Sequence, residues 1–134
     1  MDELRSKRYH DKIHHIIDYI QELPIKPRNE LEKRGIFYSL QTSIEAMVDL
    51  ITMLVKDLGF KVKEDIINIS KIVEIRKLDP ELGEKLKNAN SLRNIIIHHY
   101  NEIDEQLILD SVEGIKNLLL KWISIVEEIL DEII

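Results

Sequence analysis

The residues of this chain whose types could do chemistry are concentrated in positions 93–100, which read RNIIIHHY. In an α-helix, residues seven apart lie within about 20° of each other, and residues four apart are neighbours on one face. Arg93 would therefore share a face with Tyr100, and Asn94 would lie beside His98. A guanidinium that grips phosphate, an imidazole that transfers protons near neutral pH and a phenol form a set suited to a phosphodiester.

Spacing alone leaves a second interpretation open. Arg, His and Tyr side chains near the end of a helix can bind its last carbonyl groups and interact with the negative end of its dipole. Such residues would then have a structural role only.

The pattern Arg93-x4-His98-x-Tyr100, which starts as Arg-Asn and closes a helix, resembles the signature of the HepT-like toxins of the HEPN superfamily. The resemblance covers nearly the whole chain and is weakest in the first thirty residues. Other segments that resemble the family are residues 34–41 with Ile44 and Glu45, residues 58–60, residues 78–82 and residues 100–104.

The helical pattern of the chain predicts an all-α, antiparallel bundle of four or five helices. The resemblance implies the same architecture in a homodimer whose two motifs face a shared cleft. Arg93 would bind and polarise the scissile phosphate of RNA. His98 would act as general base or acid on the ribose 2′-hydroxyl and the leaving oxygen, and Asn94 would help to position one of these groups. The reaction would need no metal or other cofactor and would leave a 2′,3′-cyclic phosphate on single-stranded or exposed RNA.

The resemblance also implies a partner and a means of control. HepT-like toxins pair with minimal nucleotidyltransferases of the MNT type, which can attach AMP to the motif tyrosine, here Tyr100. A bulky phosphate at that position would fill the cleft and repel RNA. The resemblance therefore predicts a toxin–antitoxin pair in which modification neutralises the ribonuclease.

Three further polar residues each admit two interpretations. The position between the motif histidine and tyrosine is often small in the family but is His99 here, so the acid or base could be His98 or His99. Glu45 and Asp49 stand four apart on the predicted second helix. They form a solvated edge, or else they orient Arg93 or His98 from the neighbouring helix.

Composition predicts one helical domain spanning residues 1–134. The chain is 44% hydrophobic and 33% charged with only 4 Gly and 3 Pro, a balance typical of helical bundles. It contains no cysteine, and His10 and His14 lack a third metal ligand, so no disulfide or metal site is expected. We expect a soluble cytoplasmic protein, because no apolar run resembles a signal peptide or membrane span.

The net charge of −6 argues against a broad basic surface for long nucleic acids, so any RNA contact would be local. Apolar spacing and breaker residues predict helices over Asp2 to Glu22, Asn29 to Leu58, Lys63 to Lys77 and Pro80 to His99. Gly59 would end the second helix in a left-handed cap, and Asp79 with Pro80 would start the motif helix.

A last helix is predicted from about Glu105 to the C-terminus, with Asp104 as its cap. Its apolar residues form one continuous row, and a second row widens the apolar surface: Leu120, Ile123, Leu130 and Ile134. Such a surplus favours a homodimer, and the alternative is a helix buried at the centre of its own bundle.

Three functions remain open at the level of sequence. The chain could be a toxin-type endoribonuclease, a helical dimer that binds a nucleotide or RNA without cutting it, or an inactive accessory subunit of a nucleotidyltransferase. The presence of Arg93, His98 and Tyr100 together favours the enzyme, because a degenerate module is expected to lose one of them.

Overall fold

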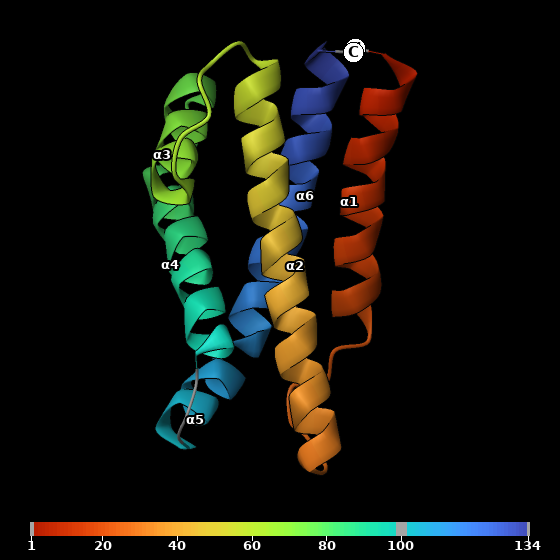
Figure 1. Cartoon of the computed structure of the whole chain (residues 1–134), viewed down its shortest axis with the longest axis vertical. Coiled ribbons are helices and arrows are strands. Elements are labelled where there is room, and N and C mark those ends of the chain that lie inside the picture. The colour runs from red at the N-terminus through yellow and green to blue at the C-terminus, as the bar shows by residue number, and fades with distance from the viewer. Residues whose placement is uncertain (1, 99–101, 134) are drawn as a thin grey trace.

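The computed structural model describes residues 2–98 and 102–133, and these form six α-helices, which confirms the all-α class. The helices lie close to the long axis of the molecule, and α2 packs against α1, α3, α4 and α6 (Figure 1). Their bounds are α1 Glu3–Gln21, α2 Glu30–Asp57, α3 Asp65–Arg76, α4 Pro80–Ile97, α5 Glu102–Asp110 and α6 Val112–Ile133.

Local signals in the sequence set several helix ends. The side chain of Asp79 accepts a hydrogen bond from the backbone N–H of Glu81, and Pro80 occupies the first turn of α4, as predicted. Gly59 adopts a φ of 91° just after α2, and the N–H of the next residue, Phe60, donates to the carbonyl of Val55 at 3.0 Å. This is the left-handed cap predicted for Gly59.

The connection over residues 58–64 departs from a simple antiparallel arrangement. It returns along the bundle, so that α3 runs in the same direction as α2 and antiparallel to α4 (Figure 1). Asn68, which is buried, fastens this segment with two hydrogen bonds to Lys63. Its Oδ1 accepts from the backbone N–H at 2.8 Å, and its Nδ2 donates to the carbonyl at 2.8 Å. The start of α3 is thereby fixed beside α4.

The single last helix that we predicted is in fact two helices that meet at Ser111. The Ser111 hydroxyl donates to the carbonyl of Leu107 at 2.8 Å, and its N–H donates to the carbonyl of Ile108, three residues back. This local hydrogen bonding ends α5, and serine then stands at a favourable position to start α6. Asp104 lies inside α5, so the prediction that it caps the last helix is wrong.

All six helices contribute apolar residues to the core, and α2 and α6 contribute the most, with the fully buried Trp122 of α6 among them. The second row of α6 is largely covered by the chain itself, because Ile123 and Leu130 are buried and only Leu120 is exposed among its described members. Ile134 lies outside the described residues. The surplus apolar surface that favoured a homodimer is therefore smaller than predicted. No helix within the described ranges is long and apolar enough to cross a membrane.

Candidate functional site

Arg93 extends from α4 toward the start of α3. Its Nη2 lies 3.7 Å from the Asp65 carboxylate and 3.4 Å from Oδ1 of Asn94, and its side chain is 21% exposed. Nε of Arg93 is buried and makes no hydrogen bond to any described residue. Because both contacts of Nη2 are long, the guanidinium keeps capacity to bind an anion through its terminal nitrogens, whereas the buried Nε is out of reach of an incoming ligand.

His98 and Asn94 stand on the last turn of the same helix. His98 is the C-cap residue of α4, and its backbone N–H donates to the carbonyl of Asn94 at 3.1 Å. Both side chains are exposed. The helix therefore brings the fork of Arg93, the amide of Asn94 and the imidazole of His98 to one accessible end.

The purely structural interpretation of the motif fits only part of this arrangement. His98 does occupy the helix cap, but through its backbone. The contacts of Arg93 lead to a carboxylate on another helix and to the Asn94 amide, instead of to the terminal carbonyl groups of α4. His99 and Tyr100 lie outside the described residues.

Glu45 and Asp49 lie on the side of α2 that faces α1, where they line a shallow groove with Lys12 and His15. Asp49 forms an ion pair with Lys12 at 2.8 Å, and Glu45 accepts a long hydrogen bond from Gln41 at 3.4 Å. Within one chain, the structure does not bring either carboxylate to Arg93.

Asp65 is the carboxylate that does approach Arg93, and the sequence analysis did not select it. Helices α3 and α4 form an antiparallel hairpin around residues 77–79, and Asp65 and Arg93 lie at similar sequence distances from that turn. Because the helical rise is the same on both sides, the two residues come to the same level. Counting outward from Asp79 and Pro80 could have placed Asp65 level with Arg93, but the direction of α3 and the side that it turns toward α4 depend on tertiary packing.

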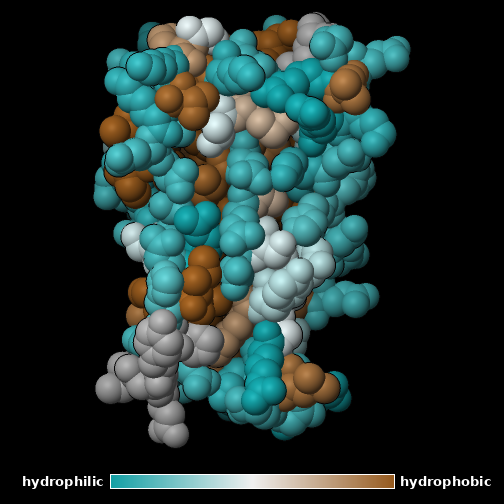
Figure 2. Space-filling model, in the orientation of Figure 1, coloured by the Kyte–Doolittle hydropathy of each residue, from teal (hydrophilic) through white to brown (hydrophobic). Residues whose placement is uncertain are grey.

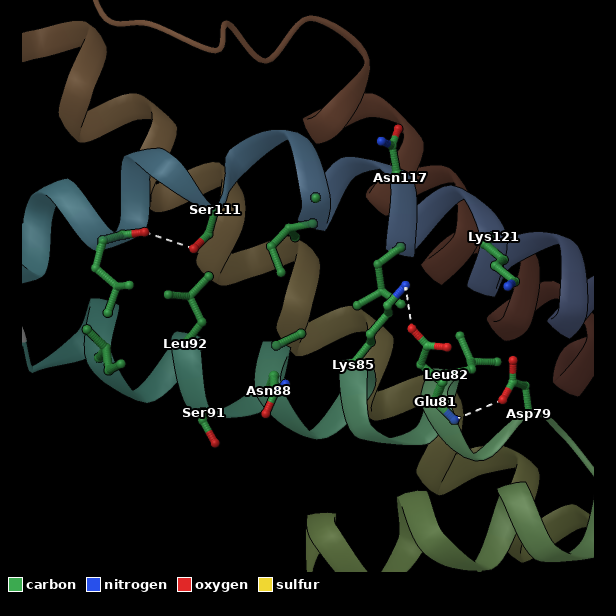
Figure 3. A pocket seen from close by; sticks show the side chains of 16 residues that line it. Asp79, Glu81, Leu82, Lys85, Asn88, Ser91, Leu92, Ser111, Asn117 and Lys121 are labelled. Atoms are coloured by element: carbon green, nitrogen blue, oxygen red, sulfur yellow. Dashed lines mark hydrogen bonds and ion pairs between the residues drawn. The ribbon is translucent and has the colours of Figure 1, made fainter.

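A hollow with a volume of about 650 Å³ lies on another side of α4, between this helix and α5–α6. Figure 3 shows Leu82 and Leu92 at this hollow, with Asn88, Ser91, Asn117 and Lys121 around it. Its lining includes neither Arg93 nor His98, and it offers no imidazole. This hollow therefore lies apart from the predicted site residues at the end of α4.

The described residues contain no group of three or more His, Asp or Glu side chains able to hold a metal ion. His10, one of the two histidines considered above as a metal edge, uses its Nδ1 in a 2.8 Å contact with the carbonyl of Ser6.

Comparison with known proteins identifies the family of this chain. The model of the family described as "Ribonuclease HepT-like" matches residues 7–127. The chain belongs to the HepT-like ribonuclease family. An Archaeoglobus fulgidus protein named "Putative RNase" is 45% identical over 130 residues, which cover 97% of this chain and 98% of that protein. A second protein of that name from the same organism is 38% identical over 104 residues, or 75% of this chain and 77% of the relative.

Two solved structures share the HepT-like fold of this chain. One is a tri-AMPylated HEPN toxin of Shewanella oneidensis in complex with an MNT antitoxin, with a TM-score of 0.74 and 18% identity over 96% of this chain and 99% of the toxin chain. The other is a toxin–antitoxin with AMP-PNP, with a TM-score of 0.72 and 17% identity over 94% of this chain and 99% of that chain. These likenesses confirm the HEPN-like helical architecture.

Proposed function

We propose that this protein is a metal-independent endoribonuclease that uses Arg93, Asn94 and His98. The observation that carries the proposal is that the guanidinium of Arg93 has only long contacts and stands near the same end of α4 as the exposed His98, in a chain of the HepT-like ribonuclease family. The exposed end of a helix also suits a polymer substrate, which would not fit an enclosed cavity.

The proposed reaction starts when an imidazole removes the proton of a ribose 2′-hydroxyl, whose oxygen then attacks the adjacent phosphorus. Arg93 stabilises the negative charge that builds up on the nonbridging oxygens. The bond from phosphorus to the 5′-oxygen breaks, and a protonated imidazole gives that oxygen its proton. The products are a 2′,3′-cyclic phosphate and a free 5′-hydroxyl. His98 takes one of the two proton-transfer roles, and His99 or His98 of the partner subunit takes the other.

The proposal includes a homodimer in which two motifs share one cleft. Ile97, next to His98, is 45% exposed within one chain, and a second copy would cover it. Light scattering tests this assembly, because a dimer has twice the mass of the chain and a monomer would contradict the shared cleft.

The proposal also includes a toxin–antitoxin role, with a nucleotidyltransferase of the MNT type as partner and Tyr100 as the acceptor of AMP. The solved HEPN toxin that shares the fold is tri-AMPylated and bound to its MNT antitoxin, which supports this assignment. Mass spectrometry after incubation with the partner and ATP should locate AMP on Tyr100, and Tyr100→Phe should prevent it. Transfer to the exposed Tyr38 instead would contradict this part of the proposal.

The deciding experiment is cleavage of total RNA in EDTA by the wild type, Arg93→Ala and His98→Ala, with analysis of the product ends. We expect cyclic phosphate ends from the wild type and a roughly 10²- to 10⁴-fold loss of rate in each variant. His14→Ala, which removes an exposed histidine of α1, is the matched control and should cleave normally.

His99→Ala in the same assay shows which imidazole is required. If His99→Ala is inactive and His98→Ala is active, the roles assigned to the two histidines are reversed. If the wild type leaves RNA intact in EDTA and Tyr100 carries no modification, the ribonuclease proposal fails. Binding without cleavage, or an accessory role beside a nucleotidyltransferase, would then replace it.

A further inference from the structure

Three aromatic rings follow one another along the seam between α1 and α2, and we call His15, Tyr19 and Tyr38 the aromatic strip. The His15 and Tyr19 ring centroids are 4.6 Å apart, and the Tyr19 and Tyr38 rings meet edge to face at 5.9 Å. Nε2 of His15 lies 2.9 Å from the hydroxyl of Thr42, a contact that holds the first ring in place. The rings are therefore fixed by contacts from both helices.

Tyr38 is the exposed residue of the strip, and His15 and Tyr19 are half-buried. Tyr38 is 58% exposed, although an aromatic ring of this size is normally turned toward a core. Figure 2 shows side chains of near-neutral hydropathy gathered over the part of the α1–α2 seam nearer the end where α4 stops. A rigid, exposed ring costs little conformational entropy when a flat partner stacks on it.

The strip leads to the end of the motif helix. Tyr38 also lines a hollow of about 390 Å³ together with Arg34 and Gln41 of α2 and Ile96 of α4. Ile96 stands two residues before His98. The far end of the strip borders the groove that contains Glu45 and Asp49, and these carboxylates would repel a phosphate. The hollow is also lined by Glu30 and Glu105, but both pair with Lys33, so a bound chain would place its charged backbone near Arg34.

The side chains around Tyr38 match the parts of a nucleotide. The Arg34 side chain is 73% exposed, and its closest carboxylate partner, Glu30, is 3.8 Å away, so its charge is available to a phosphate. Gln41 stands three residues after Tyr38 on the same face of α2 and offers both a donor and an acceptor to the edge of a base. Lys33 is less available, because it pairs with Glu30 and Glu105 at 2.8 and 2.7 Å.

We propose that the aromatic strip is a binding subsite for unpaired RNA bases that flank the scissile phosphate, with Tyr38 as the main stacking surface and Arg34 as a phosphate contact. The inference rests on the proposed ribonuclease function and identifies the substrate as single-stranded around the cut. Bases in a duplex stack on one another and cannot present a free face to Tyr38. Stacking selects unpaired bases with little preference for sequence.

The test measures binding of a fluorescent single-stranded RNA of twelve nucleotides to the His98→Ala protein, so that the RNA is not cut. Adding Tyr38→Ala should weaken binding about 5- to 100-fold, which is the range for loss of one base–aromatic stack. Tyr38→Phe keeps the ring and should bind within about twofold of the parent. Arg34→Ala should weaken binding and reduce its dependence on salt.

Phe60→Ala is the matched control, because Phe60 is a partly exposed ring after α2, outside the strip and in contact with Lys71. It should leave RNA binding unchanged. In the otherwise wild-type enzyme, Tyr38→Ala should raise KM by a similar factor and leave kcat nearly unchanged. A folded Tyr38→Ala protein, judged by circular dichroism, that binds and cleaves RNA normally would overturn the inference while the ribonuclease function stands.

The ribonuclease proposal can also fail while the stacking subsite stands. If the protein does not cleave RNA but binds single strands in a manner that depends on Tyr38, the ribonuclease proposal fails and the stacking subsite stands. If Tyr38→Ala abolishes binding of the nucleotidyltransferase partner but leaves RNA binding intact, the strip is a protein-docking surface and our inference is wrong. Equal binding of a duplex and a single strand would also contradict it.

Discussion

At the scale of single residues, the important pair is Arg93 with Asp65. The 3.7 Å separation of Nη2 and the carboxylate is too long for a strong hydrogen bond, but it keeps the guanidinium directed toward the start of α3. Asp65 also neutralises part of the charge that Arg93 offers to a phosphate. In the proposed mechanism Asp65 would act through Arg93, as a positioning residue.

Replacing Asp65 should lower kcat for RNA cleavage without raising KM. In Asp65→Ala, we expect kcat for RNA cleavage to fall by about tenfold, because a freely moving guanidinium is less often in place for the transition state. KM should stay equal or fall, since one negative charge near the phosphate is lost. Asp65→Glu should restore most of kcat. A variant whose KM rises while kcat is unchanged would show that Asp65 does not position Arg93.

At the scale of elements, the segment 58–64 decides where α3 begins and therefore where Asp65 lies. Asn68 makes two hydrogen bonds to the backbone of Lys63, and it is only 2% exposed. Glu64, the N-cap residue of α3, makes no side-chain cap hydrogen bond. The two hydrogen bonds of Asn68 therefore provide much of the side-chain stabilisation at the start of α3. The position of Asp65 depends on a contact between a loop and the helix that follows it.

We expect Asn68→Ala to lower the free energy of unfolding by roughly 2 kcal/mol, because it removes two buried hydrogen bonds and leaves backbone groups of Lys63 without partners. Urea unfolding followed by circular dichroism measures this change. Asn88→Ala is the matched control on an exposed face of α4 and should be neutral or slightly stabilising. Equal stability of the two variants would mean that Asn68 does not hold the loop.

The helix ends and the contacts between helices differ in how far the sequence could predict them. Short-range signals predicted correctly the start of α4 at Asp79 and Pro80 and the left-handed cap at Gly59, because a few neighbouring residues determine such features. The break at Ser111 was missed, since the apolar spacing continues through it. The partner of Arg93 was missed because it depends on the direction of α3, which residues 58–64 set through tertiary packing.

At the scale of the whole molecule, a hydrogen-bonded group that stabilises the fold and the candidate site residues lie at opposite ends of the bundle. The start of α1 and the ends of α2 and α6 lie together at one end, where Arg5, Asp57 and Ile133 line a common hollow, and α4 stops at the other end (Figure 1). Asp57 accepts hydrogen bonds from Arg5 Nε at 2.8 Å and from the Tyr9 hydroxyl at 2.6 Å. This group joins α1 to α2 far along the bundle from His98.

The pKa values of this group make it sensitive to acid. Burial alone would raise the pKa of Asp57, but the hydrogen bonds from Arg5 and Tyr9 outweigh it and lower the pKa below its ordinary value. Burial, with the hydrogen bond to Asp57 as the second cause, raises the pKa of Tyr9. Because the pKa of Asp57 is lowered by folding, its stabilising contribution is complete above the unfolded pKa of about 3.9 and is lost as pH falls through the folded value.

Asp57→Asn should therefore lower the free energy of unfolding by about 1–3 kcal/mol at pH 7, since it removes the charge that strengthens both hydrogen bonds. The deficit relative to the wild type should shrink as pH falls from about 5 to 2, where the wild-type carboxylate is protonated as well. Urea unfolding at several pH values measures the deficit. Asp18→Asn, at an exposed position of α1, should show little deficit at any pH.

Cleavage of RNA by folded Asp57→Asn at pH 7 and moderate temperature should match the wild type, because the α1–α2 contact lies at the opposite end from Arg93 and His98. A large loss of kcat in a fully folded Asp57→Asn protein would show that the two ends are coupled through α2. A deficit that stays constant down to pH 2 would show that the Asp57 carboxylate is not the acid-sensitive group. The pH series thus tests whether the Asp57 carboxylate stabilises the fold. The cleavage assay tests separately whether that contact affects the candidate site.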